Sequence, residues 1–159
     1  MFTEKGMNKY KVAVIGLGNV GQLYDYKNSS KNIILTHCKA ISLHPSFELV
    51  AGVDIDENNC KNFREKFAKP VFQSINELCI KHKPDVFVIA SPTKTHNEIF
   101  HEIINYSPDC IILEKPIATN AEEAFSMYEA AKENNCMVLV NYSRRFNDSI
   151  NNLKGIISG

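Results

Sequence analysis

Three glycines near the start of the chain have the spacing of a phosphate-binding turn. Gly16, Gly18 and Gly21 form the pattern G-x-G-x-x-G directly after the apolar run 12–15. In this pattern the first glycine permits a tight turn, the second lets the backbone approach a pyrophosphate, and the third lets a helix pack close to the strand. Because glycine-rich turns also occur for structural reasons alone, the dinucleotide site is predicted from the motif together with its strand-to-helix context. The predicted phosphate-binding residues are Gly16, Gly18, Asn19, Val20 and Gly21.

A carboxylate that could select the cofactor follows the second apolar run, 47–53. Asp54 ends this run, and a carboxylate at the tip of a second strand can accept hydrogen bonds from both hydroxyls of an adenosine ribose. It would also repel a 2′-phosphate, which favours NAD over NADP as the cofactor. Asp54 lies farther from the glycines than the usual spacing of about 20 residues, and a polar loop at 25–32 accounts for much of the excess. Asp56 competes for the role but is better explained as the N-cap of the next helix.

Polar residues with chemical potential also follow the later apolar runs. Ser91, Pro92 and Thr93 come after the run 85–90, and Glu114-Lys115-Pro116 comes after 110–113. Asn141-Tyr142-Ser143-Arg144-Arg145 follows the last run, 137–140. Ligands of an open parallel sheet bind outside the carboxyl ends of its strands. The convergence of these clusters on one edge is the strongest internal indication of a binding site.

The elements that must position these residues alternate between strands and helices. Helices are predicted at 36–43 and 57–67, and capping boxes at Ser74/Glu77 and Thr95/Glu98 predict two further helix starts. A fifth helix is predicted after Asn120. Continuous apolar strands joined by helices require a parallel sheet with both faces covered. We therefore predict a single-domain α/β fold with a Rossmann-type doubly wound parallel sheet in three layers.

Composition excludes several classes of function. The 159 residues are 44% hydrophobic and 23% charged, with 18 basic and 18 acidic residues, which is typical of a soluble globular domain. A net charge of zero without a basic block argues against nucleic-acid and membrane partners, and residues 1–9 lack the apolar core of a signal peptide. Five scattered cysteines without a C-x-x-C pair predict reduced, inert thiols in a cytoplasmic protein, with no disulfide and no metal site.

Five segments in the same order resemble the N-terminal domain of the Gfo/Idh/MocA oxidoreductase family. They are the glycine turn 16–21, the strand that ends at Asp54, Ala90-Ser91-Pro92-Thr93 with His96, Glu114-Lys115-Pro116, and Arg145-Phe146. The Glu-Lys-Pro segment is the most specific of these, and the resemblance covers nearly the whole chain from Lys11 onward. It implies an NAD(P)-dependent dehydrogenase that oxidises a hydroxyl of a sugar, cyclitol or related polyol.

The resemblance also implies roles for individual residues. As the catalytic residue, Lys115 would hydrogen-bond the reacting hydroxyl, and its ammonium would stabilise the negative charge that develops on the oxygen. The alternative is that Lys115 is a surface lysine paired with Glu114. The resemblance also implies that Glu114 and Lys115 contact the cofactor. Ser91, Pro92 and Thr93 would line the nicotinamide end. His96 could face the cofactor or have no catalytic role, and Arg145 could reach the nicotinamide or substrate or be a solvated charge.

The sequence departs from the family in one respect. Family members carry a second α/β domain with a catalytic histidine, whereas no histidine follows His101 here. We expect a polar leader at 1–10, a dinucleotide-binding domain at 11–146 and a connecting helix at 147–159, so that the chain by itself binds NAD but is catalytically incomplete. A non-catalytic NAD-binding sensor or scaffold is the alternative, and a methyltransferase is a distant third. An apolar stripe of the last helix invites self-association, so a homo-oligomer is one expectation: Ile150, Leu153, Ile156 and Ile157.

Overall fold

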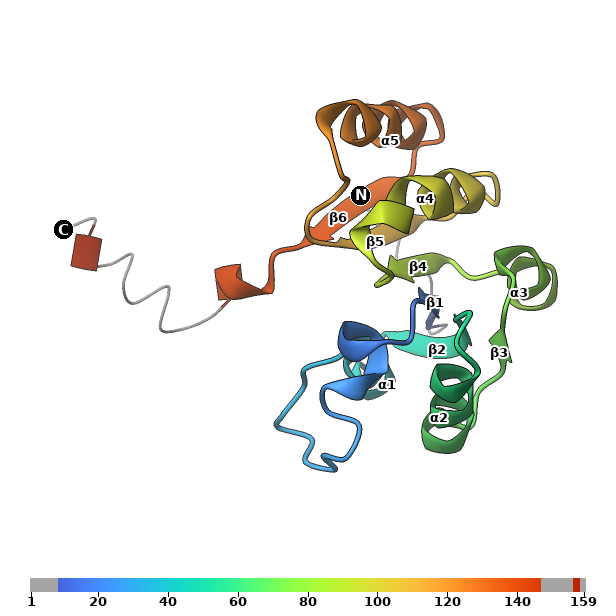
Figure 1. Ribbon diagram of the computed structural model, residues 1–159, viewed down its shortest axis with the longest axis vertical. Helices are drawn as coiled ribbons and strands as arrows, with labels where there is room; N and C mark the ends of the chain where they lie inside the picture. Colours follow the sequence, from blue (N-terminus) through green and yellow to red (C-terminus); the bar gives the residue numbers. More distant parts are fainter. Residues whose placement is uncertain (1–8, 147–155, 158–159) are drawn as a thin grey trace.

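The computed structural model describes residues 9–146 and 156–157, and residues 10–141 form one parallel sheet with helices on both sides (Figure 1). The six strands lie in the order β3-β2-β1-β4-β5-β6, so the crossovers run in opposite directions on the two sides of β1. This confirms the predicted Rossmann-type doubly wound fold. The strands are β1 (Tyr10–Ile15), β2 (Phe47–Val53), β3 (Val71–Phe72), β4 (Val86–Ile89), β5 (Cys110–Glu114) and β6 (Met137–Asn141).

Helices connect the strands wherever the apolar periodicity predicts them. The α-helices are α1 (His37–Leu43), α2 (Glu57–Phe67), α3 (Ile75–His82), α4 (His96–Ile104) and α5 (Ala121–Glu133). Short helical turns are η1 (Asn19–Leu23), a π-helix, together with the 3₁₀ turns η2 (Thr93–Thr95) and η3 (Ser143–Phe146). Part of the predicted connecting helix, including Ile150 and Leu153, lies outside the described residues; Ile156 and Ile157 are helical and exposed.

Local hydrogen bonds explain where three of the helices begin. Asp56 caps α2 by accepting from the amides of Asn58 and Asn59, and the hydroxyl of Ser74 accepts from the Glu77 amide. Asn120 accepts from the amide of Glu123 at 2.8 Å. These contacts satisfy N–H groups that lack a partner within the first turn of a helix.

The predicted capping box at Thr95 and Glu98 is wrong. The Thr95 side chain makes no capping hydrogen bond to α4. Its hydroxyl instead lies 2.9 Å from Ser91 Oγ and 2.8 Å from the Pro92 carbonyl oxygen. The threonine hydroxyl therefore closes the turn after β4, because a short side chain there reaches the preceding backbone more readily than the following helix.

Two apolar clusters lie on opposite faces of the sheet. Alternate residues of β1 separate cleanly, with Val12 and Val14 on the face of α1 and α2, and Ala13 and Ile15 on the face of α3, α4 and α5. Figure 1 shows α1 and α2 on one side of the sheet and α4 and α5 on the other. Burial of central strands on both faces explains their continuous apolar sequence.

The edge strand β6 departs from this pattern. Val138 packs against the cluster beneath α3, α4 and α5. Its neighbours Met137 and Leu139 are 38% and 48% exposed, since successive side chains of a strand point to opposite faces. Burial on both faces therefore applies to the central strands and not to the edge strand β6.

All five cysteines are buried and none forms a disulfide. Burial raises the pKa of Cys79, Cys110 and Cys136 to about 11 each, which suppresses the nucleophilic thiolate form. Within residues 9–146 and 156–157, no group of His, Cys, Asp and Glu side chains is arranged to hold a metal ion. No helix in this described part is long and apolar enough to cross a membrane.

Candidate dinucleotide site

The glycine turn joins β1 to η1, and its three glycines have different reasons for being there. Gly16 has φ near 90°, and a Cβ added to it would lie 2.5 Å from the Ser91 amide nitrogen. A Cβ on Gly21 would lie 2.1 Å from the Gly16 carbonyl oxygen. A Cβ on Gly18 would meet no atom within 4 Å. The chain itself requires the first and third glycines, whereas the space beside Gly18 is open to a ligand.

Asp54 ties the glycine turn to the tip of β2. Its Oδ2 accepts a 2.7 Å hydrogen bond from the Leu17 amide and a 3.1 Å bond from Asn59 Nδ2. Its Oδ1 accepts from the Asp56 amide at 2.8 Å. The carboxylate is therefore held in a fixed orientation at the carboxyl edge of the sheet.

Gln22, which we did not predict as a site residue, stabilises the glycine turn from beneath. Its side chain is fully buried, and Nε2 donates to the carbonyl oxygens of Leu17 at 2.9 Å and Asn59 at 2.8 Å. It thus links the glycine turn to the first turn of α2. Glutamine is usually exposed, so its residue type gives no sign of this role. The only sequence signal is its position directly after Gly21.

A cavity of about 390 Å³ opens at this edge between the ends of β1, β2 and β4. Predicted site residues from three separate segments line it: Gly16, Asp54, Ser91 and Pro92. Its remaining wall is mostly apolar and includes Ile15, Val53, Ile75 and Ile99. An apolar cavity with a few fixed polar groups is typical of a small-molecule site. Asn19 is exposed and Val20 and Thr93 are half-buried, and none of the three lines this cavity.

His96 lies inside the fold next to this cavity. Its side chain is fully buried. Nε2 lies 2.9 Å from the Ser91 carbonyl oxygen and Nδ1 lies 3.2 Å from the Ile117 carbonyl oxygen. The imidazole therefore joins the loop after β4 to the loop after β5, and both ring nitrogens are occupied by protein atoms.

A second polar cluster lies at the ends of β5 and β6. Glu114 Oε1 is 2.8 Å from His37 Nε2 and accepts a hydrogen bond from Asn141 Nδ2 at 2.6 Å. Burial alone would raise the pKa of Glu114, but the hydrogen bonds from His37 and Asn141, the charge of His37 and a hydrogen bond from the Lys115 amide lower it below its ordinary value. Lys115 itself is exposed, as is Arg145 in η3.

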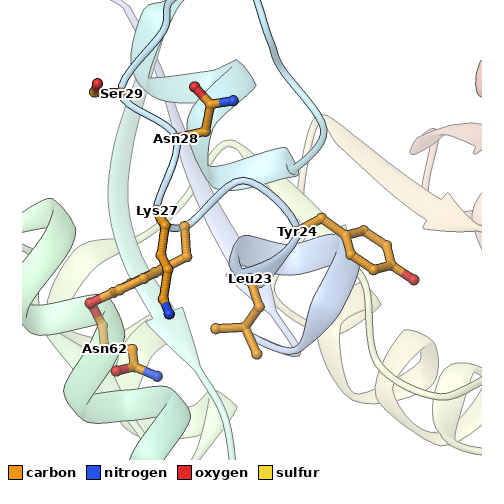
Figure 2. A pocket seen from close by; sticks show the side chains of 7 residues that line it. Leu23, Tyr24, Lys27, Asn28, Ser29 and Asn62 are labelled. Carbon is orange, nitrogen blue, oxygen red and sulfur yellow. The ribbon is translucent and has the colours of Figure 1, made fainter.

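A second cavity, of about 700 Å³, lies away from the predicted site residues (Figure 2). Leu23, Tyr24, Lys27, Asn28, Ser29 and Asn62 surround it in the close-up, and Tyr26 also lines it. It opens beside the polar insertion between η1 and α1. Asp25 closes this insertion by accepting 2.7 Å hydrogen bonds from the Leu35 amide and the Thr36 hydroxyl.

The chain matches the model of the Gfo/Idh/MocA oxidoreductase family, described as an NAD-binding Rossmann fold, over residues 10–142. It is 25% identical over 147 residues to the glucose-6-phosphate 3-dehydrogenase of Bacillus subtilis, covering 92% of this chain and 37% of that protein. It is 29% identical over 140 residues to the inositol 2-dehydrogenase of Rubrobacter xylanophilus, covering 85% of this chain and 35% of that protein. The chain thus spans somewhat over a third of these relatives.

Solved structures of similar proteins have the same fold. A myo-inositol 2-dehydrogenase from Lactobacillus plantarum superposes with a TM-score of 0.76 at 21% identity, over 95% of this chain and 41% of that one. The WlbA dehydrogenase from Bordetella pertussis, solved with NADH and UDP-GlcNAcA, gives a TM-score of 0.78 at 23% identity, over 95% and 40%.

Proposed function

The chain belongs to the Gfo/Idh/MocA family of oxidoreductases, and we propose on this basis that it is the NAD-binding part of a dehydrogenase. The substrate would be a sugar, cyclitol or related polyol oxidised at a CH–OH group. The observation that carries the proposal is the cavity at the carboxyl edge, where the glycine turn, Asp54 and the loop after β4 meet. The names of the relatives, a sugar-phosphate and an inositol dehydrogenase, support the substrate class.

The residues present fit a dinucleotide. Open space beside Gly18 leaves room for a pyrophosphate close to the backbone. The cavity beside Asp54 suits an adenosine, with the carboxylate at the ribose and the exposed Ile55 at the rim. Because Ser91 and Pro92 line this cavity together with Asp54, we assign them to the adenosine side and leave Thr93 at the nicotinamide end.

Lys115 is the residue we propose to face the substrate. A bound nicotinamide would supply the hydride acceptor. The exposed ammonium of Lys115 would hydrogen-bond the reacting hydroxyl and stabilise negative charge as its proton leaves. Arg145 is exposed after β6, where it could contact the nicotinamide or the substrate.

NAD is expected to bind at least tenfold more tightly than NADP. Three hydrogen bonds hold the Asp54 carboxylate at the carboxyl edge of the sheet, where it would lie beside the ribose and repel a 2′-phosphate. A tenfold difference corresponds to about 1.4 kcal/mol. Calorimetric titration with both cofactors checks this. Asp54→Asn should reduce the preference for NAD over NADP. Asp56→Asn keeps an oxygen that can cap α2 and should leave this preference unchanged. Equal affinity for the two cofactors in the unaltered chain would overturn the assignment of Asp54.

Residues 1–159 alone are expected to bind NAD without oxidising a polyol at an enzyme-like rate. General acid–base catalysis contributes about 10²–10⁴-fold, and the two histidines nearest this edge are already engaged: His96 with two carbonyl oxygens and His37 with Glu114. The test is absorbance of reduced nicotinamide with a panel of sugars and inositols. Steady reduction would show that this part carries its own base.

The same engagement of both histidines also fits a non-catalytic NAD-binding sensor or scaffold. The two functions differ in what the complete natural protein does. A natural protein much longer than 159 residues that oxidises a polyol and loses this activity with Lys115→Met supports the dehydrogenase. A natural protein of this mass that binds NAD without turnover supports the sensor.

A further inference from the structure

We infer that His37 is a positioning residue for Lys115 and acts on it through the carboxylate of Glu114. The inference rests on the proposed function only for the role of Lys115 towards a substrate. The contacts themselves are independent of that role: His37 Nε2 lies 2.8 Å from Glu114 Oε1, and the backbone amide of Lys115, the next residue along the chain, lowers the pKa of the same carboxylate.

Three segments far apart in the sequence meet at this carboxylate. His37 is the first residue of α1, Glu114 is the last residue of β5 and Asn141 is the last residue of β6. Glu114 and Asn141 are direct partners in the parallel register of the two strands. The beginning of α1 is fixed in turn by Asp25, which accepts from the hydroxyl of Thr36, the residue before His37.

The environment of Glu114 makes its two side-chain donors important. Glu114 is only 8% exposed, and a buried carboxylate is costly unless hydrogen-bond donors surround it. Since the pKa of Glu114 lies below its ordinary value, the group is ionised at neutral pH and only accepts, so Nε2 of His37 carries the proton. Within the described part of the chain, His37 is the ionisable side chain in contact with it.

The carboxylate holds the backbone from which the Lys115 side chain extends. A hydrogen bond from an amide to an ionised acceptor is stronger than one to a neutral acceptor. Loss of the His37 donor would raise the pKa of Glu114, since His37 lowers it both by hydrogen bonding and by charge. The Lys115 amide would then have a weaker acceptor, and the lysine would be held less firmly.

The test follows the Lys115 amide in protein labelled with ¹⁵N-lysine, with Lys115→Arg used to assign its signal. His37→Gln and His37→Asn form a matched pair that differs by one methylene, and only the longer amide reaches the position of Nε2. In the unaltered chain the chemical shift of the Lys115 amide should follow the titration of Glu114, with a midpoint below the ordinary pKa of a glutamate. His37→Asn should raise this midpoint and speed hydrogen exchange of the Lys115 amide at least tenfold, and His37→Gln should restore most of both.

A control and a second readout separate this inference from the proposed function. His101→Asn removes a surface histidine that contacts Ser126 and should leave the Lys115 signal unchanged. If both His37 variants leave the midpoint and exchange rate of Lys115 unchanged, the inference is overturned. The second readout is NADH binding by the unaltered chain, measured by fluorescence. Failure of the unaltered chain to bind NADH would refute the proposed function and not the coupling of His37 to Lys115.

Discussion

Gly18→Val is expected to weaken NAD binding at least a hundredfold while the chain stays folded. A Cβ at Gly18 meets no atom within 4 Å, so the unliganded chain has room for the valine. The same branched side chain would occupy the space where a pyrophosphate must approach the backbone. A hundredfold loss corresponds to about 2.7 kcal/mol. The measurement is calorimetric titration with NAD, with circular dichroism to establish the fold.

Gly18→Ala is the graded control for this prediction. Its single methyl group should leave the stability within about 0.5 kcal/mol of the unaltered chain, as for other substitutions that touch nothing, and it should weaken NAD binding less than valine does. A folded Gly18→Val variant that binds NAD normally would mean that the phosphate site lies elsewhere.

Gly21→Ala is expected to lower the free energy of unfolding by about 3 kcal/mol or more. The added Cβ would lie 2.1 Å from the Gly16 carbonyl oxygen, and this neighbour is backbone that cannot turn aside. Overpacking a tight contact commonly costs about 1–3 kcal/mol and occasionally more, and η1 would have to move away from β1. Urea unfolding followed by circular dichroism measures the change.

The pair Gly18→Ala and Gly21→Ala makes this a sharp comparison, because the same methyl group is added at two positions of one turn. Only the second should destabilise the chain. Equal unfolding midpoints for the two variants would show that Gly21 is not required for close packing of η1 against the end of β1.

Most of the architecture could be predicted because it depends on local signals. Apolar runs at the correct spacing identified the strands, and β2 and α2 have the predicted bounds. Asp56, Ser74 and Asn120 cap their helices as expected, since a cap depends on residues within one turn of each other. At Thr95 the local rule failed, because the hydroxyl could reach Ser91 and Pro92 instead of the helix.

The candidate site is a mixture of what local patterns determine and what only the packed sheet decides. The sequence by itself predicted that the glycine turn and Asp54 lie at one edge of the sheet, because each directly follows a strand. It did not reveal Gln22 beneath the turn, the burial of His96, or His37 beside Glu114. His37 and Glu114 are 77 residues apart. Such contacts depend on strand order and on where α1 begins after the insertion, and these are settled only when the apolar faces pack together.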